Sequence, residues 1–414
     1  MMLPARLQTS PYLTCVRPGD ESPVVYMTDT LGPEFPHMTA AGDAAFGVIG
    51  LDRRVIWHRD PMGLSALQDA APEPLSTRSL AERFGLDLIR DLVARGWLQD
   101  PSVLCRDYVL RTGQIEVTAH CNWGCSYCPV SVDPKPKATM PMDLFTEIIE
   151  KLQPHRDIRF VTFHFFNEPT LDKHFSERID VLSEYGMKLS LSSNASALTS
   201  SKTKQLIDSE VMHHLVVNLP SLHEAEFSSL TAGSTFQQSM RNLDGVVAAE
   251  KFPITIAVNG VGESVSRRRE ELAAVYEPRG VEVVATQTCD RAGALENEYH
   301  QDVRVDTRLR GCSWPLNHAY FSVTGDMFIC CNDYYQRETF GNIRDGSVHE
   351  IMTSTEAVRL RRRVFGVEDA PADYICRTCH DQKLDFVHRQ FRPPASFPLE
   401  VVNAKRCGTG NSCG

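Results

Sequence analysis

The stretch Ala119-His-Cys121-Asn-Trp-Gly-Cys125-Ser-Tyr-Cys128-Pro129 carries three cysteines at C-x3-C-x2-C spacing. It follows a predicted strand over residues 114–118, so the three thiols are expected in a loop at a strand end. Three neighbouring thiolates bind three irons of a cubane cluster and leave the fourth iron open for a ligand. The alternatives are a structural zinc or a four-cysteine cluster completed from elsewhere, but zinc knuckles usually come as two C-x-x-C pairs and this triplet stands by itself. The triplet therefore predicts a catalytic iron–sulfur cluster on Cys121, Cys125 and Cys128.

From about residue 111 the chain alternates between strand-like and helix-like segments. The predicted strands are 114–118, 160–166, 188–191, 215–219, 254–258 and 281–286, and the predicted helices are 141–152, 174–185 and about 200–209. This alternation predicts an α/β fold with a parallel sheet, open or closed into a barrel. Ligands bind such sheets at the carboxyl ends of the strands.

The cysteine spacing and its position resemble the radical S-adenosylmethionine (SAM) superfamily over residues 111 to about 295. The resemblance implies a partial (β/α)6 TIM-like barrel with SAM bound to the open iron. It also implies an enzyme that reductively cleaves SAM to a 5′-deoxyadenosyl radical, which abstracts a hydrogen from the substrate. In such an enzyme the cofactor performs the chemistry, and the protein positions it and excludes water.

Other strand ends carry polar residues at the family's SAM-binding positions. Phe166-Asn167-Glu168 stands where the family usually has Gly-Gly-Glu, so Glu168 is expected to bind the amino group of SAM. The aromatic Tyr127 is expected to cover the adenine. The other expected SAM contacts are Asn167, Ser192, Asn194, Asn218 and Asn259. Taken singly, such residues are more often strand-end caps or turn formers, but their repetition at successive strand ends favours one shared site.

A second group of cysteines consists of Cys312, Cys330, Cys376 and Cys379. A hairpin turned at Gly325-Asp326 is predicted to bring the first two together. Four thiolates saturate a [4Fe–4S] cluster, and by chemistry alone a structural zinc fits nearly as well. The Gly-x4-Cys and C-x-x-C pattern resembles the SPASM or twitch extension, which implies an auxiliary cluster. Only Cys407 and Cys413 follow, so we expect one auxiliary cluster, two [4Fe–4S] clusters in all, and Cys331 as a spare thiol.

The first 110 residues are predicted to form a separate unit. We expect helices at 40–50, 76–84 and 86–95, followed by an extended segment from Trp97. This order is typical of a winged-helix-like module. It also resembles the peptide-chaperone fold of pyrroloquinoline quinone biosynthesis, which binds the leader of a precursor peptide as an added strand. A packing domain is the alternative interpretation.

Four regions follow from these patterns. They are a winged-helix-like domain (1–110), a radical SAM partial barrel (111–295), an auxiliary twitch/SPASM-like domain (296–390) and a flexible cysteine-containing tail (391–414). Three further thiols, Cys289, Cys407 and Cys413, are candidate hydrogen-atom donors for an epimerisation. The basic runs at 267–269 and 359–363 are expected to be solvated helix faces, as is usual for charge runs.

Bulk properties narrow the functional classes. The chain has 414 residues and a net charge of −10, which argues against a nucleic-acid surface. No apolar run approaches the roughly 20 residues of a membrane span, and the N-terminus lacks the core of a signal peptide. We therefore expect a cytoplasmic protein without a membrane partner. In that reducing compartment, thirteen cysteines favour metal binding or catalysis over disulfides.

The predicted function is modification of a ribosomally made peptide, by a cross-link or a side-chain change. The alternative is dehydrogenation or epimerisation of a small-molecule natural product such as an aminoglycoside or a nucleoside sugar. A third interpretation is an iron–sulfur electron-transfer protein without SAM chemistry, against which Glu168 and the strand-end residues argue. The expected reductant is a low-potential flavodoxin or ferredoxin.

Overall fold

The computed structural model describes residues 3–16, 44–50, 55–163, 165–233, 235–260, 263–287, 291–295, 309 and 311–379. Its central feature is a nine-stranded sheet in the order β12-β11-β10-β9-β8-β7-β13-β14-β15. The first six strands in chain order are β7 (Thr112–Ile115), β8 (Phe160–Thr162), β9 (Leu189–Ser193), β10 (Met212–Asn218), β11 (Ile254–Gly260) and β12 (Glu282–Gln287). Each pairs in parallel with its neighbour, so the predicted α/β partial barrel is confirmed.

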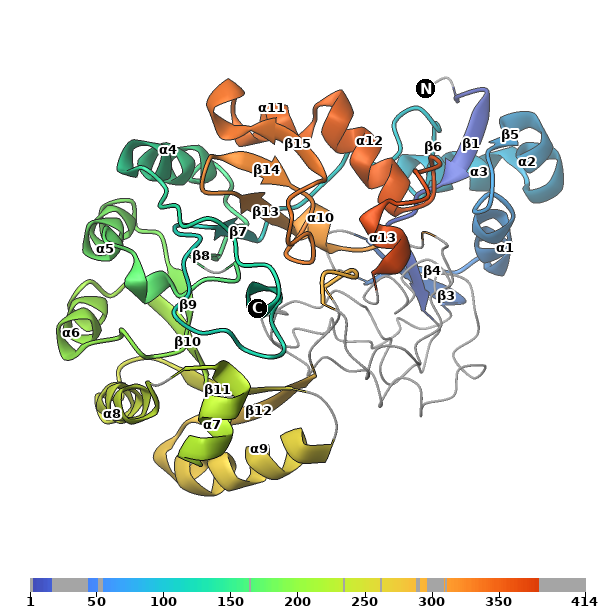
Figure 1. Cartoon of the computed structure of the whole chain (residues 1–414). Helices are drawn as coiled ribbons and strands as arrows, with labels where there is room; N and C mark the ends of the chain where they lie inside the picture. The colour runs from blue at the N-terminus through green and yellow to red at the C-terminus, as the bar shows by residue number, and fades with distance from the viewer. Residues whose placement is uncertain are drawn as a thin grey trace.

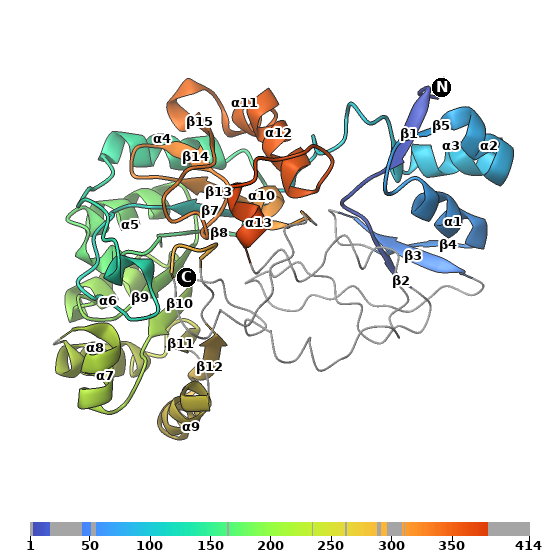
Figure 2. The same cartoon turned by 45° about the vertical axis from the view of Figure 1, so that its right-hand side comes forward.

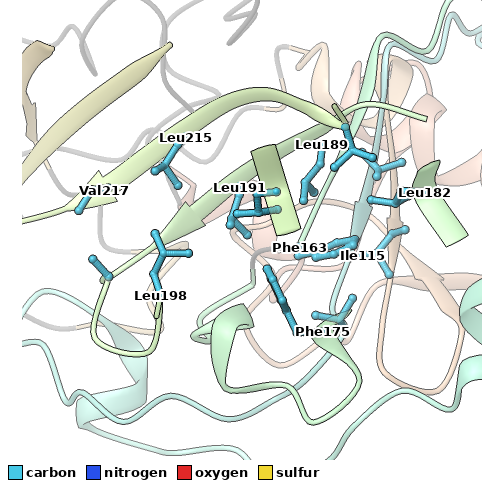
Figure 3. Close-up of a cluster of buried hydrophobic side chains, with 14 of the residues drawn as sticks. Ile115, Phe163, Phe175, Leu182, Leu189, Leu191, Leu198, Leu215 and Val217 are labelled. Atoms are coloured by element: carbon cyan, nitrogen blue, oxygen red, sulfur yellow. The ribbon is translucent and has the colours of Figure 1, made fainter. Parts of the chain in front are cut away.

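Helices cover the outer face of these parallel strands (Figure 1). They are α4 (Met142–Leu152), α5 (Phe175–Glu184), α6 (Ser200–Asp208), α7 (Glu224–Thr231), α8 (Phe236–Val247) and α9 (Glu263–Tyr276), with short 3-10 turns η1 (Pro129–Ser131), η2 (Pro169–Leu171) and η3 (Glu277–Arg279). Strand residues alternate between the two faces of the sheet. Leu191 and Val217 thus point into the layer beneath the helices, where Phe175 and Leu198 meet them (Figure 3). The other face of each strand is left for the site.

The second cysteine region continues the same sheet. Strand β13 (His318–Phe321) pairs in parallel with β7, from His318 opposite Thr112 to Phe321 opposite Ile115. Strand β14 (Asp326–Phe328) returns antiparallel to β13, and Gly325 has a φ of 86° at the turn, so the predicted hairpin is confirmed. The remaining elements are β15 (Thr339–Asn342), α10 (Trp314–Asn317), η5 (Ile343–Asp345), α11 (Val348–Met352), α12 (Thr355–Val364) and α13 (Ile375–Thr378).

The N-terminal unit lies beside the barrel as a separate group of elements (Figure 2). Its described residues form two small sheets, β5-β1-β6 and β2-β3-β4, and three helices. The bounds are β1 (Arg6–Thr9), β2 (Thr14–Val16), β3 (Phe46–Ile49), β4 (Val55–His58), α1 (Pro61–Asp69), β5 (Leu75–Ser76), α2 (Thr77–Phe84), α3 (Leu86–Ala94) and β6 (Leu98–Gln99). Ser76 caps α2 by accepting from the Ser79 amide, as its position before the helix predicts.

The helix predicted over residues 40–50 is wrong in its described part. Residues 46–49 form strand β3, which pairs with both β2 and β4. Phe46 and Val48 alternate toward the core, where each is 1% exposed, and Gly47 lies between them. Glycine costs about 1 kcal/mol inside a helix, and backbone pairing on both sides satisfies the strand instead.

The basic runs are solvated only in part, because Arg267 and Arg359 are 49% and 58% exposed while another arginine in each run is buried. Arg361 is 1% exposed and donates to the carbonyl oxygens of Cys105 (2.8 Å) and Met352 (2.7 Å). Arg362 donates to the Pro101 carbonyl oxygen at 2.8 Å, so α12 is joined to the segment that follows β6. Arg268, 2% exposed, donates to the Pro220 carbonyl oxygen at 2.9 Å. These arginines therefore serve the packing of the chain. Separately, no helix in the described residues is both long and apolar enough to cross a membrane.

One buried ion pair supports the end of β7. Arg178 on α5 and Asp172 are both fully buried and lie 2.5 Å apart, and the same guanidinium donates to the Met140 carbonyl oxygen at 2.5 Å. We expect Arg178→Met to lower the free energy of unfolding by about 3–5 kcal/mol, because it leaves the Asp172 carboxylate buried without its cation. Urea unfolding measures the change.

The matched control is Arg78→Met, which removes a side chain that is 88% exposed from a pair with Glu82. Exposed i,i+4 pairs contribute little, so its unfolding curve should match that of the parent protein. Equal destabilisation by the two variants would contradict the structural role of Arg178.

Candidate functional site

The first cysteine loop lies on the connection between α7 and α8. The Gly124 amide donates to the Thr231 carbonyl oxygen at 2.8 Å, and the Ser126 amide donates to that of Leu230 at 2.9 Å. The indole of Trp123 is buried and donates to the Thr235 hydroxyl at 2.8 Å. These three bonds fix the backbone of the loop before any ligand binds.

The thiols of this loop are shielded from water. Cys125 is buried, and Cys121 and Cys128 are half-buried. Burial raises the pKa of Cys121 to about 12 and also raises the pKa of Cys125 and of Cys128. Deprotonating these thiols is therefore unfavourable unless a metal binds the resulting thiolates. Such a set of buried thiols fits an iron–sulfur cluster. In the described residues, no three His, Cys, Asp or Glu side chains converge on one metal ion; a cubane does not require this, since each thiolate binds a different iron.

Tyr127 connects the cysteine loop to two strand ends. Its hydroxyl accepts from the Asn218 amide at 3.1 Å, and Asn218 Oδ1 accepts from Asn259 Nδ2 at 2.9 Å. The same hydroxyl hydrogen-bonds Cys125. The structure therefore brings three sequence-predicted residues, from the loop, β10 and β11, into one hydrogen-bonded row that ends at a cysteine.

Glu168 is 1% exposed and organises the neighbouring strand end. Its Oε1 accepts from the Thr170 amide (3.1 Å), the Thr170 hydroxyl and the Ser193 hydroxyl (2.8 Å), and its Oε2 accepts from the Asn194 amide (2.6 Å). Burial raises the pKa of this carboxyl, although each of the four bonds opposes the shift. Oε2 accepts from one donor in the described residues whereas Oε1 accepts from three, so Oε2 can take a further donor.

Phe166 and Asn167 stand where the family usually has two glycines, and Phe166 has an unusual backbone conformation. Phe166 has a φ of 52°, in the left-handed region where glycine is the ordinary residue. Asn167 fixes this turn, because its Oδ1 accepts from the Phe165 amide at 3.1 Å and its Nδ2 donates to the Thr118 carbonyl oxygen at 2.6 Å. Strand β8 therefore ends at Thr162, four residues earlier than the sequence suggested. Asn167 is a turn former here, and its expected contact with SAM remains a prediction.

The end of β9 is also joined to the cysteine loop. Asn194 Nδ2 donates to Asn122 Oδ1 at 2.9 Å, and Asn122 Nδ2 donates to the Ser196 hydroxyl at 2.9 Å. Ser192 is half-buried on the face of β9 opposite the helices. The expected SAM residues thus gather around the cysteine loop, where Asn122 and Ser193 join them.

The second group of cysteines shares one pocket. Its lining residues are Cys312, Trp314, Pro315, Ile329, Cys330, Asn332, Cys376 and Cys379. Cys312 precedes β13 and Cys330 follows β14, so both lie at the open end of the hairpin, as predicted. Burial raises the pKa of Cys330 and of Cys376 well above the usual value. Cys331 is buried but does not line the pocket, which favours Cys330 as the ligand.

The two cysteine groups are connected by residues that sequence reasoning missed. Glu116, 1% exposed, accepts from Lys135 of the cysteine loop (2.8 Å) and from Gln336 of the second region (2.8 Å). Tyr334 donates to the Asp133 carbonyl oxygen at 2.5 Å, and its ring packs 4.9 Å from that of Phe166. These contacts join residues far apart in the chain, so no local pattern marks them.

Three predicted residues lie outside the described part of the chain. They are the candidate hydrogen donors Cys289, Cys407 and Cys413.

Comparisons with known proteins agree with this geometry. Residues 115–273 match the model of the Radical SAM superfamily, and residues 312–380 match that of SPASM, an iron–sulfur cluster-binding domain. The chain is therefore a radical SAM enzyme with a SPASM domain. The first domain implies a [4Fe–4S] cluster and SAM, and the second implies auxiliary iron–sulfur binding.

Two curated relatives and one solved structure show the range of similar proteins. The SAM-dependent 2-deoxy-scyllo-inosamine dehydrogenase of Niallia circulans is 24% identical over 272 residues, which are 65% of this chain and 92% of that protein. A cofactor-modifying protein for tungsten-containing aldehyde ferredoxin oxidoreductase, from Pyrococcus furiosus, is 23% identical over 54% of this chain and 58% of its own length. SuiB of Streptococcus suis, solved with its precursor peptide SuiA, has a TM-score of 0.53 at 11% identity and covers 85% of this chain and 90% of its own.

Iron analysis can test the second ligand set. We expect the reconstituted protein to hold about eight irons per chain, four for each cubane. Cys330→Ala should lower the count toward four, whereas Cys331→Ala, one residue away, should keep about eight. The reverse result would assign the ligand to Cys331, and a count near four that Cys376→Ala leaves unchanged would remove the second cluster.

Equilibrium dialysis with SAM can test Glu168. If Oε2 also accepts from the ammonium of SAM, Glu168→Gln removes a charge-assisted bond of about 1.5–3 kcal/mol. The dissociation constant of SAM should then rise about 10- to 150-fold. The control is Glu116→Gln, a second buried glutamate at a strand end, which should keep the parent affinity. Unchanged SAM affinity in Glu168→Gln would leave this carboxylate with a structural role only.

Proposed function

We propose that this enzyme modifies a peptide, forming a cross-link or changing a side chain, and that its N-terminal unit holds the peptide. The observation that carries this proposal is strand β4 (Val55–His58), which in the described residues pairs with β3 on one side only. An edge strand presents unpaired backbone groups to which an extended peptide can add.

The surroundings of β4 suit such a peptide. Helix α3 packs beside the strand, since His58 Nε2 lies 3.0 Å from Asp91 Oδ2. Two apolar side chains are exposed on these elements, Ile56 on β4 (37%) and Leu86 on α3 (43%). Backbone pairing supplies affinity in this mode of binding, and side-chain contacts of this kind supply specificity.

The comparisons support the same direction. SuiB, which was solved with a precursor peptide, matches 85% of this chain in fold. The Niallia circulans dehydrogenase aligns with only 65% of it. Much of this chain therefore lies outside the alignment with the dehydrogenase, and binding a long substrate would give that additional part a role.

Each part of the site has a task in this proposal. Cys121, Cys125 and Cys128 hold the first cluster, and Cys312, Cys330, Cys376 and Cys379 hold the second. When bound, the first cluster and SAM supply one-electron cleavage of the sulfonium and hydrogen-atom abstraction. Glu168 and Asn194 bind and orient the SAM amino acid group, Tyr127 faces the adenine, and the buried wall around Phe165 and Tyr320 excludes water. A flavodoxin or ferredoxin supplies the electron.

A second candidate is dehydrogenation or epimerisation of a small molecule. The similarity to the Niallia circulans dehydrogenase over 92% of that protein favours it. Under this alternative the edge of β4 has no role in substrate binding, so changes there should not affect turnover.

Isotope transfer distinguishes the two candidates even while the substrate itself is unidentified. Source cells are grown in deuterated medium, and their extract is separated by size into peptides and small molecules. We expect the reconstituted enzyme with SAM and dithionite to place deuterium in 5′-deoxyadenosine only with the peptide fraction. Transfer only from the small-molecule fraction would overturn the proposal. No 5′-deoxyadenosine with any fraction, and no effect of Cys121→Ala, would contradict SAM chemistry altogether.

The edge strand is tested in the same assay. Ile56→Asp should lower deuterium transfer from the limiting peptide fraction at least about tenfold, the effect of losing about 1.4 kcal/mol of binding. Slow SAM cleavage without substrate should stay unchanged. Val103→Asp is the matched control, since Val103 is 40% exposed and lies outside β4 and α3.

A further inference from the structure

Asn332 lies at the second group of cysteines without being one of them. Its side chain is 3% exposed and lines the pocket that the four cysteines share. Its Nδ2 donates to Cys379 Sγ at 3.5 Å, within the range of a hydrogen bond to sulfur. Its Oδ1 accepts from Arg291 Nη1 at 3.3 Å. One amide thus connects a cysteine sulfur to a cation.

Arg291 comes from the opposite side of the site, after strand β12. The residue is 4% exposed, and its guanidinium lies 5.2 Å from the ring centroid of Phe166. The next residue is also tied to the second region, since the Ala292 carbonyl oxygen accepts from Thr378 beside Cys379 at 3.2 Å. The charge of Arg291 also acts on Cys128, whose pKa it lowers against the larger effect of burial. The cation therefore lies within electrostatic reach of both cysteine groups.

A donor at this position has a defined effect on a cluster. Reduction adds one negative charge to the iron–sulfur core and its thiolates. An amide that donates to a ligating sulfur stabilises the more negative state and raises the reduction potential. The effect is strong where water is excluded, as it is around Asn332. Arg291 fixes which end of the amide faces the sulfur, because a guanidinium only donates and so selects Oδ1.

We propose that Asn332 raises the reduction potential of the auxiliary cluster through its bond to Cys379, and that Arg291 is the positioning residue that orients it. This inference rests on the proposed assignment of Cys312, Cys330, Cys376 and Cys379 as cluster ligands. A purely structural role for Asn332, as a turn residue after Cys331, would leave the potential unchanged.

The test uses the full chain with Cys121, Cys125 and Cys128 changed to alanine, so that one cluster remains. Iron analysis comes first, and about four irons per chain are expected. The protein is then titrated with dithionite in the presence of redox mediators, each cluster taking one electron from dithionite. Electron paramagnetic resonance of the reduced cluster reports the midpoint potential.

In this background, Asn332→Leu keeps the approximate size and removes the donor, so the potential should shift to more negative values. Arg291→Gln keeps the donor but removes the group that orients it, and should shift the potential in the same direction. Asn342→Leu is the matched control, because the Asn342 amide binds Thr324 and Asp326 at the hairpin turn; it should keep the parent potential.

The outcomes separate this inference from the function on which it rests. A background protein without about four irons would overturn the ligand assignment itself. Full iron with unchanged potentials in Asn332→Leu and Arg291→Gln would overturn the inference and leave the assignment standing. If Asn332→Leu fails to hold iron, Asn332→Ala decides the question by the same measurement, because Arg291→Gln also removes a nearby charge.

Discussion

The parallel pairing of β7 with β13 is the interaction on which both sites depend. Strand β7 leads into the first cysteine loop, and β13 begins the hairpin whose open end carries Cys312 and Cys330. Backbone hydrogen bonds extend the ladder at both ends, from Arg111 to Asn317 (2.7 Å) and from Glu116 to Phe321 (2.9 Å). The SPASM domain therefore continues the barrel sheet, and a rigid ladder fixes its distance from the SAM site.

Both cysteine groups are placed where free thiolates are unfavourable. Burial is the largest cause of the raised pKa at Cys121, Cys125 and Cys376. The same dry surroundings strengthen every bond that reaches a sulfur, so Tyr127 at Cys125 and Asn332 at Cys379 occupy comparable positions at the two sites. Each is in turn held by an amide or guanidinium from the end of another strand. The barrel therefore supplies each site with a cysteine loop and with the residues that orient its polar neighbours.

The pattern of apolar residues predicted most of the barrel. A strand packed beneath helices shows apolar residues either at alternate positions or along its whole length. The same reasoning failed at residues 46–49, where an apolar run containing Gly47 is too short to distinguish a strand from a helix. Motif spacing identified Cys121, Cys125 and Cys128, and the pocket agrees with the choice of Cys330. It could not identify Glu116, Arg291 or Asn332, whose roles arise from contacts between distant segments. Nor could motif spacing show that Phe166 takes a left-handed backbone, a conformation that favours glycine, since Asn167 enforces that turn through Thr118.

The presence of Phe166 at this turn also affects how the two domains pack. A glycine would leave open space at this turn, whereas the Phe166 ring lies between Tyr334 of the SPASM domain and the guanidinium of Arg291. This contact packs the turn before Glu168 against the SPASM domain and against a cation that follows β12. The proposed peptide substrate is therefore supported by the edge of β4, and the Phe166 turn serves to join the two domains around Glu168.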